Sequence, residues 1–339
     1  MSLIPQRLWV LVTGANGYLA SHIVDQLLLA GFNVRGTVRT IPKGNWLVEY
    51  FVKKFGLGRF ELAEVPDMAA AGAFQTAVKG VSAVVHTACD MSFGPDPNVV
   101  INNTLNGTLA LLRASTTESL IKRFVLTSSA AACAWPSPDT PVDIDENSWH
   151  TAAVERAWAP APYEPARAWD VYAASKTQQE QAVWAFARDN KPQFVVNSVI
   201  PNTLFGSLLA PGKQDNTSTN GFVTGIYQVG WDVVGMIPPQ YHSDVHDIAR
   251  LHVIAITDPD VANERLFGYA DKYDYNQVLQ ILRRLSPDHK FPADKPGLKA
   301  DQSRILRRGR AEDLLRRHYG QDGFVGLVES VEETVRHVL

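Results

Sequence analysis

Only two cysteines, Cys89 and Cys133, occur among the 339 residues of this chain. Two thiols are too few for a disulfide scaffold or a cysteine-rich zinc site, and they fit a reducing compartment. The sequence also lacks any run of 18 apolar residues, so we expect no membrane-spanning helix. Its first residues contain no basic segment followed by an apolar one, so we do not expect secretion. These absences together predict a cytoplasmic protein.

The protein also has little net charge. The chain has 32 basic and 35 acidic residues and a net charge of −3, which does not favour nucleic acid or an anionic membrane as a partner. One basic cluster lies near the C-terminus and is interrupted by Glu312 and Asp313, which is typical of a solvated helix face. It comprises Arg304, Arg307, Arg308, Arg310, Arg316 and Arg317. The 45% hydrophobic content is ordinary for a globular enzyme.

A short glycine motif near the N-terminus is the first positive signal. An apolar run over 8–12 predicts a buried strand, and it is followed by Gly14-x-x-Gly17-x-x-Ala20 and an amphipathic helical pattern. Gly14 permits a tight turn, and Gly17 lets the backbone approach a pyrophosphate closely. The phosphates would lie at the helix N-terminus, where free N–H groups and the helix dipole favour anions. By itself the motif is equally compatible with a strand–turn–helix that binds nothing.

Strands and helices alternate through the first 200 residues. Expected strands at 33–38, 60–64, 83–87, 124–127 and 194–200 are separated by helices, including 69–78, 99–115 and 170–188. This alternation predicts an α/β protein with a doubly wound parallel sheet, with ligands outside the carboxyl ends of its strands. Residues 134–169 read as an irregular insertion. We assign 1–202 with 241–264 to a dinucleotide-binding domain, and 203–240 with 265–339 to a substrate-binding lobe.

The end of the second strand indicates which dinucleotide binds. NAD-binding proteins usually place an acidic residue there to hold the ribose hydroxyls, but no acidic residue occurs between Asp25 and Glu49. The strand ends in Arg39, and Lys43 follows four residues later. Because a guanidinium pairs well with a phosphate, NADP(H) is favoured over NAD(H). Lys43 alone would equally be a solvated loop residue.

Further along, the pattern Tyr172-x-x-x-Lys176 lies within an expected helix. The spacing places a phenol and an ammonium on one helix face. A nearby cation favours the phenolate and brings tyrosine into a range useful for proton transfer. Ser129 follows an expected strand end and could hydrogen-bond a substrate oxygen that gains charge. His86 lies in an apolar run and is more readily read as a core histidine than as a catalytic one.

Candidate substrate contacts are less specific. Met91 and Phe93 lie in a loop after the fourth strand, and later aromatic and polar residues could line the same pocket or simply form the core of the lobe. These are Tyr227, Trp231, Met236, Pro238 and Gln240. His246 and Asp247 are adjacent on an expected helix over 246–257, but no third residue has the spacing of a metal ligand. We therefore expect no metal site.

With these residues in place, the chain resembles an extended short-chain dehydrogenase/reductase with a Rossmann-type sheet. The resemblance runs from about Leu8 to Tyr269 and rests on VTGANGYLASHIVDQLL, VRGTVRT, KRFVLTSSAA, VYAASK and the stretch around IPNTLFG. Within that superfamily it is most similar to microbial aldehyde/ketone reductases, and next to plant dihydroflavonol reductases.

The resemblance implies specific roles. Ser129 would hold the carbonyl oxygen, Tyr172 would donate the proton, and Lys176 would bind the nicotinamide ribose and tune Tyr172. Many extended members have an asparagine three residues before the Gly-Thr of the fourth helix, whereas Thr104 stands there in this chain, between Asn103 and Asn106. Which residue completes a proton relay is thus open. The remaining implied cofactor contacts are Asn16, Gly17, Tyr18 and Leu19 with the pyrophosphate, Arg39 and Lys43 with the 2′-phosphate, Asp67 and Met68 with the adenine, and Thr87, Ala88, Thr127 and Pro201 around the ribose and nicotinamide.

The sequence therefore predicts NADPH-dependent reduction of aldehydes or ketones, with a hydrophobic or aromatic carbonyl substrate. The alternatives are a dihydroflavonol-like or steroid-like oxidoreductase of secondary metabolism, an NADP(H) sensor without turnover, and an epimerase or dehydratase. A monomer and a homodimer are both compatible with the sequence.

Overall fold

The computed structural model describes residue 5 and residues 7–214, 218–235 and 237–339. The chain divides into two compact units. The first unit comprises Met1–Trp135, Asn147–Ile200 and His252–Leu266, and the second comprises Pro136–Glu146, Pro201–Leu251 and Phe267–Leu339. Four segments group differently from the domains expected from the sequence: 136–146, 201–202 and 241–251 belong to the second unit, and 265–266 belong to the first.

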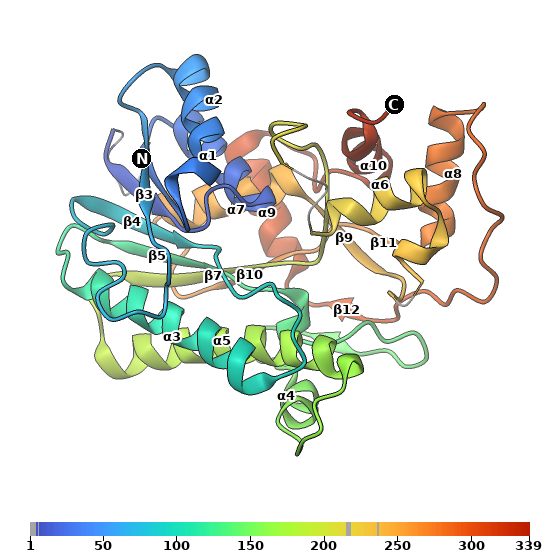
Figure 1. Cartoon of the computed structure of the whole chain (residues 1–339), viewed down its shortest axis with the longest axis horizontal. Coiled ribbons are helices and arrows are strands. Elements are labelled where there is room, and N and C mark those ends of the chain that lie inside the picture. The colour runs from blue at the N-terminus through green and yellow to red at the C-terminus, as the bar shows by residue number, and fades with distance from the viewer. Residues whose placement is uncertain (1–4, 6, 215–217, 236) are drawn as a thin grey trace. The chain divides into compact units, whose positions relative to one another are not determined.

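A seven-stranded sheet forms the centre of the first unit (Figure 1). Across the sheet, the strands are β10 (Arg265–Gly268), β7 (Val195–Pro201), β5 (Arg123–Thr127), β4 (Val81–His86), β1 (Trp9–Val12), β2 (Asn33–Val38) and β3 (Phe60–Glu64). From β7 to β3 all neighbouring pairs are parallel. The chain runs outward from β1 to β3 and then returns to β4, so the switch in strand order falls between β1 and β4. The expected doubly wound α/β fold is confirmed.

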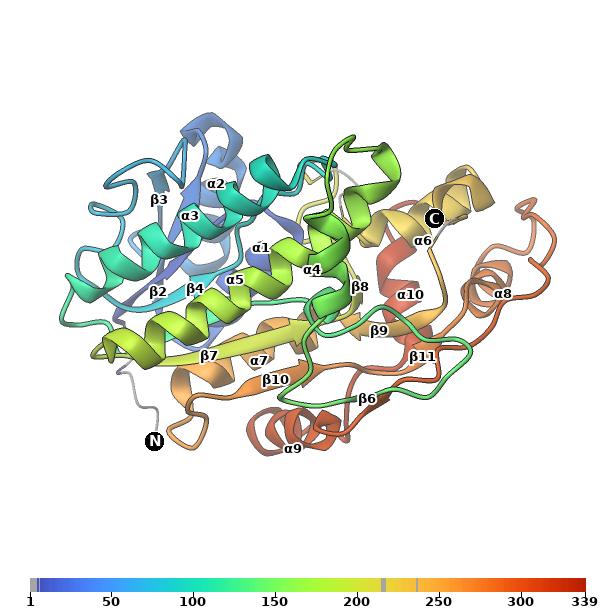
Figure 2. The same cartoon turned by 90° about the horizontal axis from the view of Figure 1, so that it is seen from below.

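Helices cover both faces of this sheet. On one face α3 (Pro97–Thr116) and α5 (Ala168–Asn190) lie side by side, and Figure 2 shows them crossing in front of the strands. The other face is covered by α1 (Tyr18–Leu29) and α2 (Asn45–Phe55). Because both faces are covered, β4 and β5 are buried at every residue, which explains why residues 83–85 and 124–126 at their centres are all apolar.

Two expectations about local structure require correction. Residues 69–78, expected as a helix, form a series of turns, because Gly72 has φ of +74° and interrupts any right-handed helix there. The segment 134–169, expected to be irregular, contains β6 (Asp143–Ile144), α4 (Thr151–Ala157) and a short 3-10 turn, η3 (Pro165–Arg167). Two further 3-10 turns in the first unit are η1 (Ile41–Lys43) and η2 (Ala130–Ala132).

The second unit has its own sheets and core. Its three-stranded sheet has the order β11 (Lys272–Tyr273), β9 (Gln240–Asp244) and β8 (Thr203–Phe205), and β6 pairs with β12 (Arg304–Ile305). Its helical elements are α6 (Asn220–Gln228), η4 (Trp231–Val233), α8 (Tyr275–Leu285), α9 (Arg308–Tyr319) and α10 (Leu327–Val335). Phe205, Ile226 and Leu279 belong to a buried apolar cluster that joins α6, α8 and α10.

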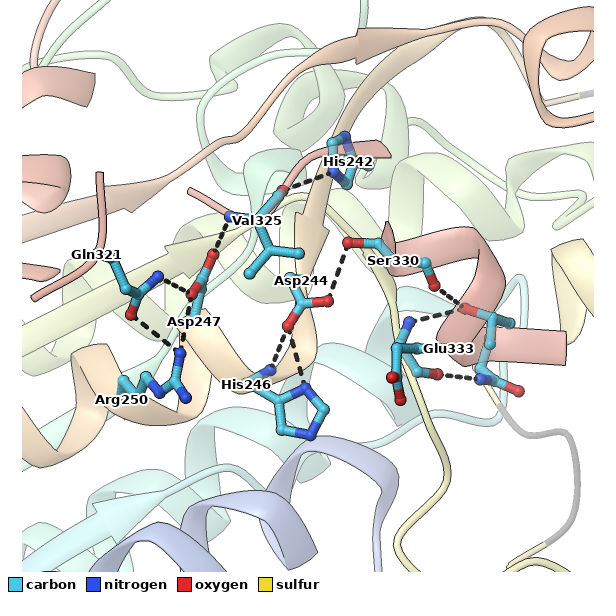
Figure 3. A network of polar contacts seen from close by, with 12 residues as sticks. His242, Asp244, His246, Asp247, Arg250, Gln321, Val325, Ser330 and Glu333 are labelled. Carbon is cyan, nitrogen blue, oxygen red and sulfur yellow. Dashed lines mark hydrogen bonds and ion pairs between the residues drawn. The ribbon is translucent and has the colours of Figure 1, made fainter. Parts of the chain in front are cut away.

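A polar network holds the C-terminal segment of the second unit (Figure 3). Helix α7 (Val245–Thr257) begins beside it, and the buried Asp247 accepts hydrogen bonds from the Val325 backbone N–H (2.7 Å) and Gln321 Nε2 (2.7 Å). Asp244 accepts from the Ser330 hydroxyl (2.9 Å) and contacts His246 Nδ1 at 3.2 Å. His246 and Asp247 thus make structural contacts. Within the described ranges, no three His, Cys, Asp or Glu side chains group as metal ligands.

None of the helices in the described part of the chain is long and apolar enough to cross a membrane.

Candidate active site

The glycine motif forms the turn between β1 and α1. Gly14 has φ of +63°, and a Cβ atom there would lie 3.2 Å from the Cβ of Ala88. Its backbone N–H donates to the Thr37 hydroxyl of β2 (3.2 Å), while the N–H of Gly17 donates to the carbonyl of Gly14 (2.9 Å). Gly36, which sequence reasoning missed, is equally constrained, because a Cβ there would lie 2.5 Å from that of Ala15. Glycine is required at both places to let β2 and β4 approach the turn.

The start of α1 fits a dinucleotide pyrophosphate. Gly17 is the residue that caps the helix, and the first turn, Tyr18 to Ser21, contains no acidic side chain. The first N–H groups of an α-helix have no carbonyl one turn back along the chain to bond with, and the helix dipole adds positive potential there. Asn16 is half-buried, whereas Tyr18 and Leu19 are buried. The turn therefore offers an anion a cradle of backbone donors without a competing carboxylate.

At the end of β2, Arg39 is exposed and forms no hydrogen bond or ion pair with any other described residue. Lys43 is exposed at the end of η1, four residues further on. Both cations are therefore available to a phosphate that binds at this edge of the sheet. Arg39 also acts on Asp90: partial burial opposes ionisation there, but hydrogen bonds from Ser92 and Asn103 and the charge of Arg39 lower the pKa of that carboxyl.

Asp67 and Met68 follow β3 by a few residues. Asp67 is exposed, and its carboxylate accepts a hydrogen bond from the Ala69 backbone N–H (2.8 Å). Met68 is half-buried and packs against Gly107 of α3, where an added Cβ would lie 3.0 Å from the Met68 Cβ. The pair lies after β3 on the same edge of the sheet as Arg39, since parallel strands all end at one edge.

The end of β4 is fixed to β1 by Thr13. Its hydroxyl accepts hydrogen bonds from the backbone N–H groups of Thr87 and Ala88, both at 3.1 Å, and the Thr87 hydroxyl donates to the Thr13 carbonyl. His86 is 1% exposed and has hydrogen-bond partners on both ring nitrogens. Burial, and then the charge of Lys176, lowers the pKa of His86 to about 3, so its imidazole is neutral.

Three consecutive polar residues lie at the end of β5: Thr127 is its last residue, and Ser128 and Ser129 follow it. The Thr127 hydroxyl pairs with His252 Nε2 (2.8 Å), and Ser128 is buried and donates to the Glu180 carboxylate (2.7 Å). Ser129 is half-buried, and its hydroxyl accepts a hydrogen bond from the Ala131 backbone N–H (3.2 Å). Of the two serines, only Ser129 has an exposed part that a substrate oxygen could reach.

Tyr172 and Lys176 lie one turn apart on α5, as the spacing predicted. Burial raises the pKa of Tyr172, the charge of a Cys89 thiolate acts in the same direction, and a hydrogen bond with Ser129 lowers it. The phenol is therefore protonated at neutral pH in the chain alone. Its hydrogen bond with Ser129 brings together two residues that are 43 positions apart in the sequence.

Lys176 is 3% exposed, and its ammonium has three N–H donors. Two are used: the Nζ atom donates to the carbonyl of Thr127 (2.8 Å) and to Gln179 Oε1 (2.9 Å). The third has no partner among the described residues. β7 is the neighbour of β5 in the sheet, and its last residue is Pro201.

A row of aromatic rings begins at Tyr172 and continues through Phe93 and Trp169 to Trp135. The Phe93 ring centroid lies 5.1 Å from that of Tyr172 and 5.2 Å from that of Trp169. Phe93 and Trp169 are each 38% exposed, and Trp135 contacts Trp169 at 6.0 Å. Phe93 holds φ of +51°, which is uncommon for a residue other than glycine. Sequence reasoning missed Trp135 and Trp169, although the density of tryptophan in the insertion was a usable signal.

The other candidate contacts are placed as follows. Met91 is 45% exposed in the loop after β4. In the second unit, Tyr227 stacks on His289 with centroids 4.4 Å apart, and Trp231 Nε1 donates to the Ala293 carbonyl (2.8 Å). Both pack against the apolar cluster of that unit. Gln240 Nε2 donates to the Pro238 carbonyl (3.4 Å), and Met236 lies outside the described residues.

The three candidate residues for a proton relay, Thr104, Asn103 and Asn106, differ in burial and in their hydrogen bonds. Thr104 is buried, and its hydroxyl accepts from the Asp90 backbone N–H at 3.4 Å. Asn103 is exposed and donates to the Asp90 carboxylate (3.1 Å), and Asn106 is exposed on α3.

Comparison with known proteins adds independent information. A model described as the NAD dependent epimerase/dehydratase family matches residues 10–267. Aldehyde reductase 2 of Sporidiobolus salmonicolor is 37% identical over 336 residues, which cover 98% of this chain and 97% of that protein. Ketoreductase adrE of Penicillium roqueforti is 38% identical over 338 residues, which cover 98% and 97%.

A solved structure gives the same indication. The crystal structure of yeast methylglyoxal/isovaleraldehyde reductase Gre2, complexed with NADPH, matches with a TM-score of 0.82 and 26% sequence identity. The match covers 98% of each chain.

Proposed function

The chain belongs to the NAD-dependent epimerase/dehydratase family of extended short-chain dehydrogenases/reductases, and on that premise we propose that it reduces aldehydes or ketones to alcohols with NADPH. It is an oxidoreductase that acts on carbonyl and alcohol groups. The observation that carries the proposal is the grouping of Ser129, Tyr172 and Lys176 at the ends of β5 and α5 in the unit that contains the glycine turn. A sensor without turnover would need none of these three side chains.

The chain's own residues account for the proton chemistry. When bound, NADPH supplies a hydride to the carbonyl carbon. Ser129 donates a hydrogen bond to the substrate oxygen and so stabilises its growing negative charge. Tyr172, protonated at neutral pH because burial raises its pKa, donates the proton to that oxygen. Lys176, through its remaining N–H, orients the nicotinamide ribose and stabilises the resulting phenolate.

We assign the cofactor contacts to the residues around the glycine turn and the neighbouring strand ends. Arg39 and Lys43 bind the 2′-phosphate, and Asp67 and Met68 flank the adenine. The pyrophosphate lies on Gly14, Asn16, Gly17, Tyr18 and Leu19, and the ribose and nicotinamide lie between Thr87, Ala88, Thr127 and Pro201. Two observations on the described residues support this assignment: Arg39 at the end of β2 pairs with none of them, and no side chain among them caps the start of α1.

The substrate is a hydrophobic and preferably aromatic carbonyl compound. Phe93 lies beside Tyr172 and Trp169 lies beside Phe93, and both rings are partly exposed and can pack against a planar apolar group. Met91, Tyr227, Trp231 and Gln240 stay as candidate contacts with the remainder of the substrate. The protein acts in the cytoplasm as a monomer or homodimer.

The primary test is oxidation of NADPH, followed by absorbance, with a panel of carbonyl compounds. The panel contains an aromatic aldehyde, an aryl β-ketoester, a dicarbonyl and a dihydroflavonol, with NADH in parallel. We expect turnover with NADPH well above that with NADH, and faster reduction of the aryl substrates than of alkyl compounds of equal size. Tight NADPH binding without any oxidation would contradict the proposal, and NAD that co-purifies with the protein would favour an epimerase or dehydratase.

Replacement of Arg39 tests the cofactor assignment. Arg39→Gln removes the guanidinium that pairs with the 2′-phosphate, so the Kd for NADPH should rise roughly 10–100-fold, as for loss of charge-assisted hydrogen bonds. The Kd for NADH should change little, because NADH has no 2′-phosphate. Fluorescence titration measures both.

Arg113→Gln is the matched control for Arg39→Gln. Arg113 is exposed in the last turn of α3, and that helix leads away from the carboxyl ends of the strands. A similar loss of NADH and NADPH affinity in Arg39→Gln would show that Arg39 does not read the 2′-phosphate.

A further inference from the structure

Lys176 is connected to the end of β4 by a buried chain of hydrogen bonds that the proposed reaction does not yet use. Gln179 Nε2 donates to the Thr108 hydroxyl of α3 (2.9 Å), and that hydroxyl contacts His86 Nε2 (3.0 Å). His86 Nδ1 contacts the Thr13 hydroxyl (2.9 Å). The chain thus runs from the candidate catalytic helix to the strand end that flanks the cofactor.

The direction of every bond in this chain is determined. Gln179 must present its oxygen to Lys176, since an ammonium only donates, so its Nε2 donates to Thr108. The single hydrogen of the Thr108 hydroxyl goes to the carbonyl of Thr104 (2.8 Å). His86 Nε2 therefore carries the hydrogen that reaches Thr108.

The same reasoning continues to β1. With Nε2 protonated and the imidazole neutral, His86 Nδ1 accepts the hydrogen of the Thr13 hydroxyl. Both lone pairs of that hydroxyl are then taken by the backbone N–H groups of Thr87 and Ala88. The hydrogen and both lone pairs of each hydroxyl and both ring nitrogens of His86 are thus used, so a change at one member leaves its neighbours unsatisfied.

Burial determines whether this chain of hydrogen bonds can carry protons. Gln179 and His86 are 1% exposed, and Thr108 and Thr13 are 0% exposed, so none of them can exchange a proton with water. The chain ends on backbone amides, which do not take up protons. It is therefore a device that fixes positions and not a proton relay.

Resting on the proposed reduction, we propose that Gln179, Thr108 and His86 are positioning residues for Lys176. Gln179, held by Thr108 and His86, takes one of the three N–H groups of Lys176, and the Thr127 carbonyl takes a second, so that the third is left for Tyr172 and the cofactor ribose. The three positioning residues also tie the position of Lys176 to that of Thr87 and Ala88, beside the cofactor. Gln179 is three residues after Lys176, on the same buried side of α5.

Gln179→Met tests the inference, because methionine keeps the volume and removes both polar atoms. We expect kcat to fall about tenfold or more with little change in the KM for the carbonyl compound. The loosened ammonium stabilises the Tyr172 phenolate less, so the pH profile of alcohol oxidation should shift to higher pH. Cys89 is the other titratable group beside Tyr172, so Cys89→Ala in both backgrounds shows that the shift does not come from the thiol.

Gln178→Met is the matched control. Gln178 is the preceding residue on α5. Its side chain accepts a hydrogen bond from Trp158 and does not bond to Lys176, Thr108 or His86. Its kcat and pH profile should equal those of the unmodified protein. If Gln179→Met behaves as Gln178→Met in kcat, pH profile and NADPH affinity, the inference is wrong.

Thr108 provides an independent pair in case Gln179→Met does not fold. Thr108→Val removes the hydroxyl and keeps the shape, whereas Thr108→Ser keeps the hydroxyl. We expect Thr108→Val to shift the pH profile in the same direction as Gln179→Met, and Thr108→Ser to restore it. Equal profiles for the two Thr108 variants, with only a difference in thermal stability, would overturn the positioning role.

NADPH affinity separates failure of this inference from failure of the proposed function. If the unmodified protein binds NADPH but reduces no carbonyl compound, the proposed function fails. The inference then stands or falls on fluorescence titration alone: Gln179→Met should weaken NADPH binding severalfold and Gln178→Met should not.

Discussion

Substitution of Tyr172 by phenylalanine is expected to lower kcat for carbonyl reduction by about 10²–10⁴-fold, the range for loss of a general acid. The ring remains, so its packing against Phe93 is kept and NADPH should bind with a Kd within about threefold of the original. The measurement is steady-state oxidation of NADPH with an aryl aldehyde, together with fluorescence titration of the cofactor.

Tyr163→Phe serves as the control for the loss of a hydroxyl. Tyr163 is also half-buried in the first unit, and its hydroxyl accepts a hydrogen bond from Asn98 Nδ2 (3.0 Å). Its kcat should be close to that of the unmodified protein. A Tyr172→Phe variant with near-normal kcat would exclude Tyr172 as the proton donor, whereas loss of turnover with intact NADPH binding excludes a sensor without catalysis.

The pH dependence of the unmodified protein follows from the same residue. Because the pKa of Tyr172 is raised, the phenol is the dominant form at neutral pH, and this form donates the proton in reduction. Reduction should therefore be independent of Tyr172 ionisation near pH 7 and fall on the alkaline side. Alcohol oxidation needs the phenolate and should rise over the same range.

The second large effect is expected at the ion pair of Arg265 and Glu180. The Arg265 guanidinium contacts both carboxylate oxygens, at 2.9 and 3.0 Å, and the two side chains are 5% and 0% exposed. Ser128 and Ser198 also donate to the carboxylate (2.7 and 2.6 Å). Arg265→Met leaves a buried carboxylate without its cation, and the free energy of unfolding should fall by about 3–5 kcal/mol.

The stability of the unmodified protein and that of Arg265→Met should also depend differently on pH. In the unmodified protein burial opposes ionisation of Glu180, but Arg265 and the serines lower its pKa, so this contribution to stability is lost as pH falls below the unfolded value. Without Arg265, burial dominates and raises the pKa of Glu180. The variant should then become more stable as pH falls from 7 toward 5. Chemical denaturation at several pH values measures both trends.

Two further variants serve as controls for the stability of Arg265→Met. Arg188→Met breaks a fully exposed pair with Asp189 and should not change stability measurably. The double variant Glu180→Leu with Arg265→Met removes both charges and should be more stable than Arg265→Met alone. If Arg265→Met has the same stability and pH trend as Arg188→Met, the buried pair does not contribute as described.

Much of the fold could be predicted because its signals are local. Five strands over 33–38, 60–64, 83–87, 124–127 and 194–200 were expected within one to two residues of the observed bounds. Strands that are covered on both faces contain runs of apolar residues, such as 83–85 and 124–126, and this pattern does not depend on the rest of the chain. The helix expected at 69–78 was wrong, because a single glycine with positive φ interrupts an otherwise helical composition.

The site was predictable to the extent that it depends on short spacings. Three of its features depend only on residues close together in the sequence. They are the Gly14–Gly17 turn, the absence of an acidic residue near Arg39, and the one-turn separation of Tyr172 and Lys176. The reductase family follows from these motifs and is confirmed by relatives that match over almost the whole chain.

Only the tertiary structure decided which residues surround that site. The bond from Lys176 to Thr127, the link from Thr108 to His86, and the contact of Phe93 with Trp169 join positions on different strands, helices and loops. Likewise, β6 pairs with β12 across 161 residues of sequence. A sequence specifies the local geometry of the backbone through the residues on either side, whereas such contacts depend on how distant elements pack, and packing is a property of the folded chain as a whole.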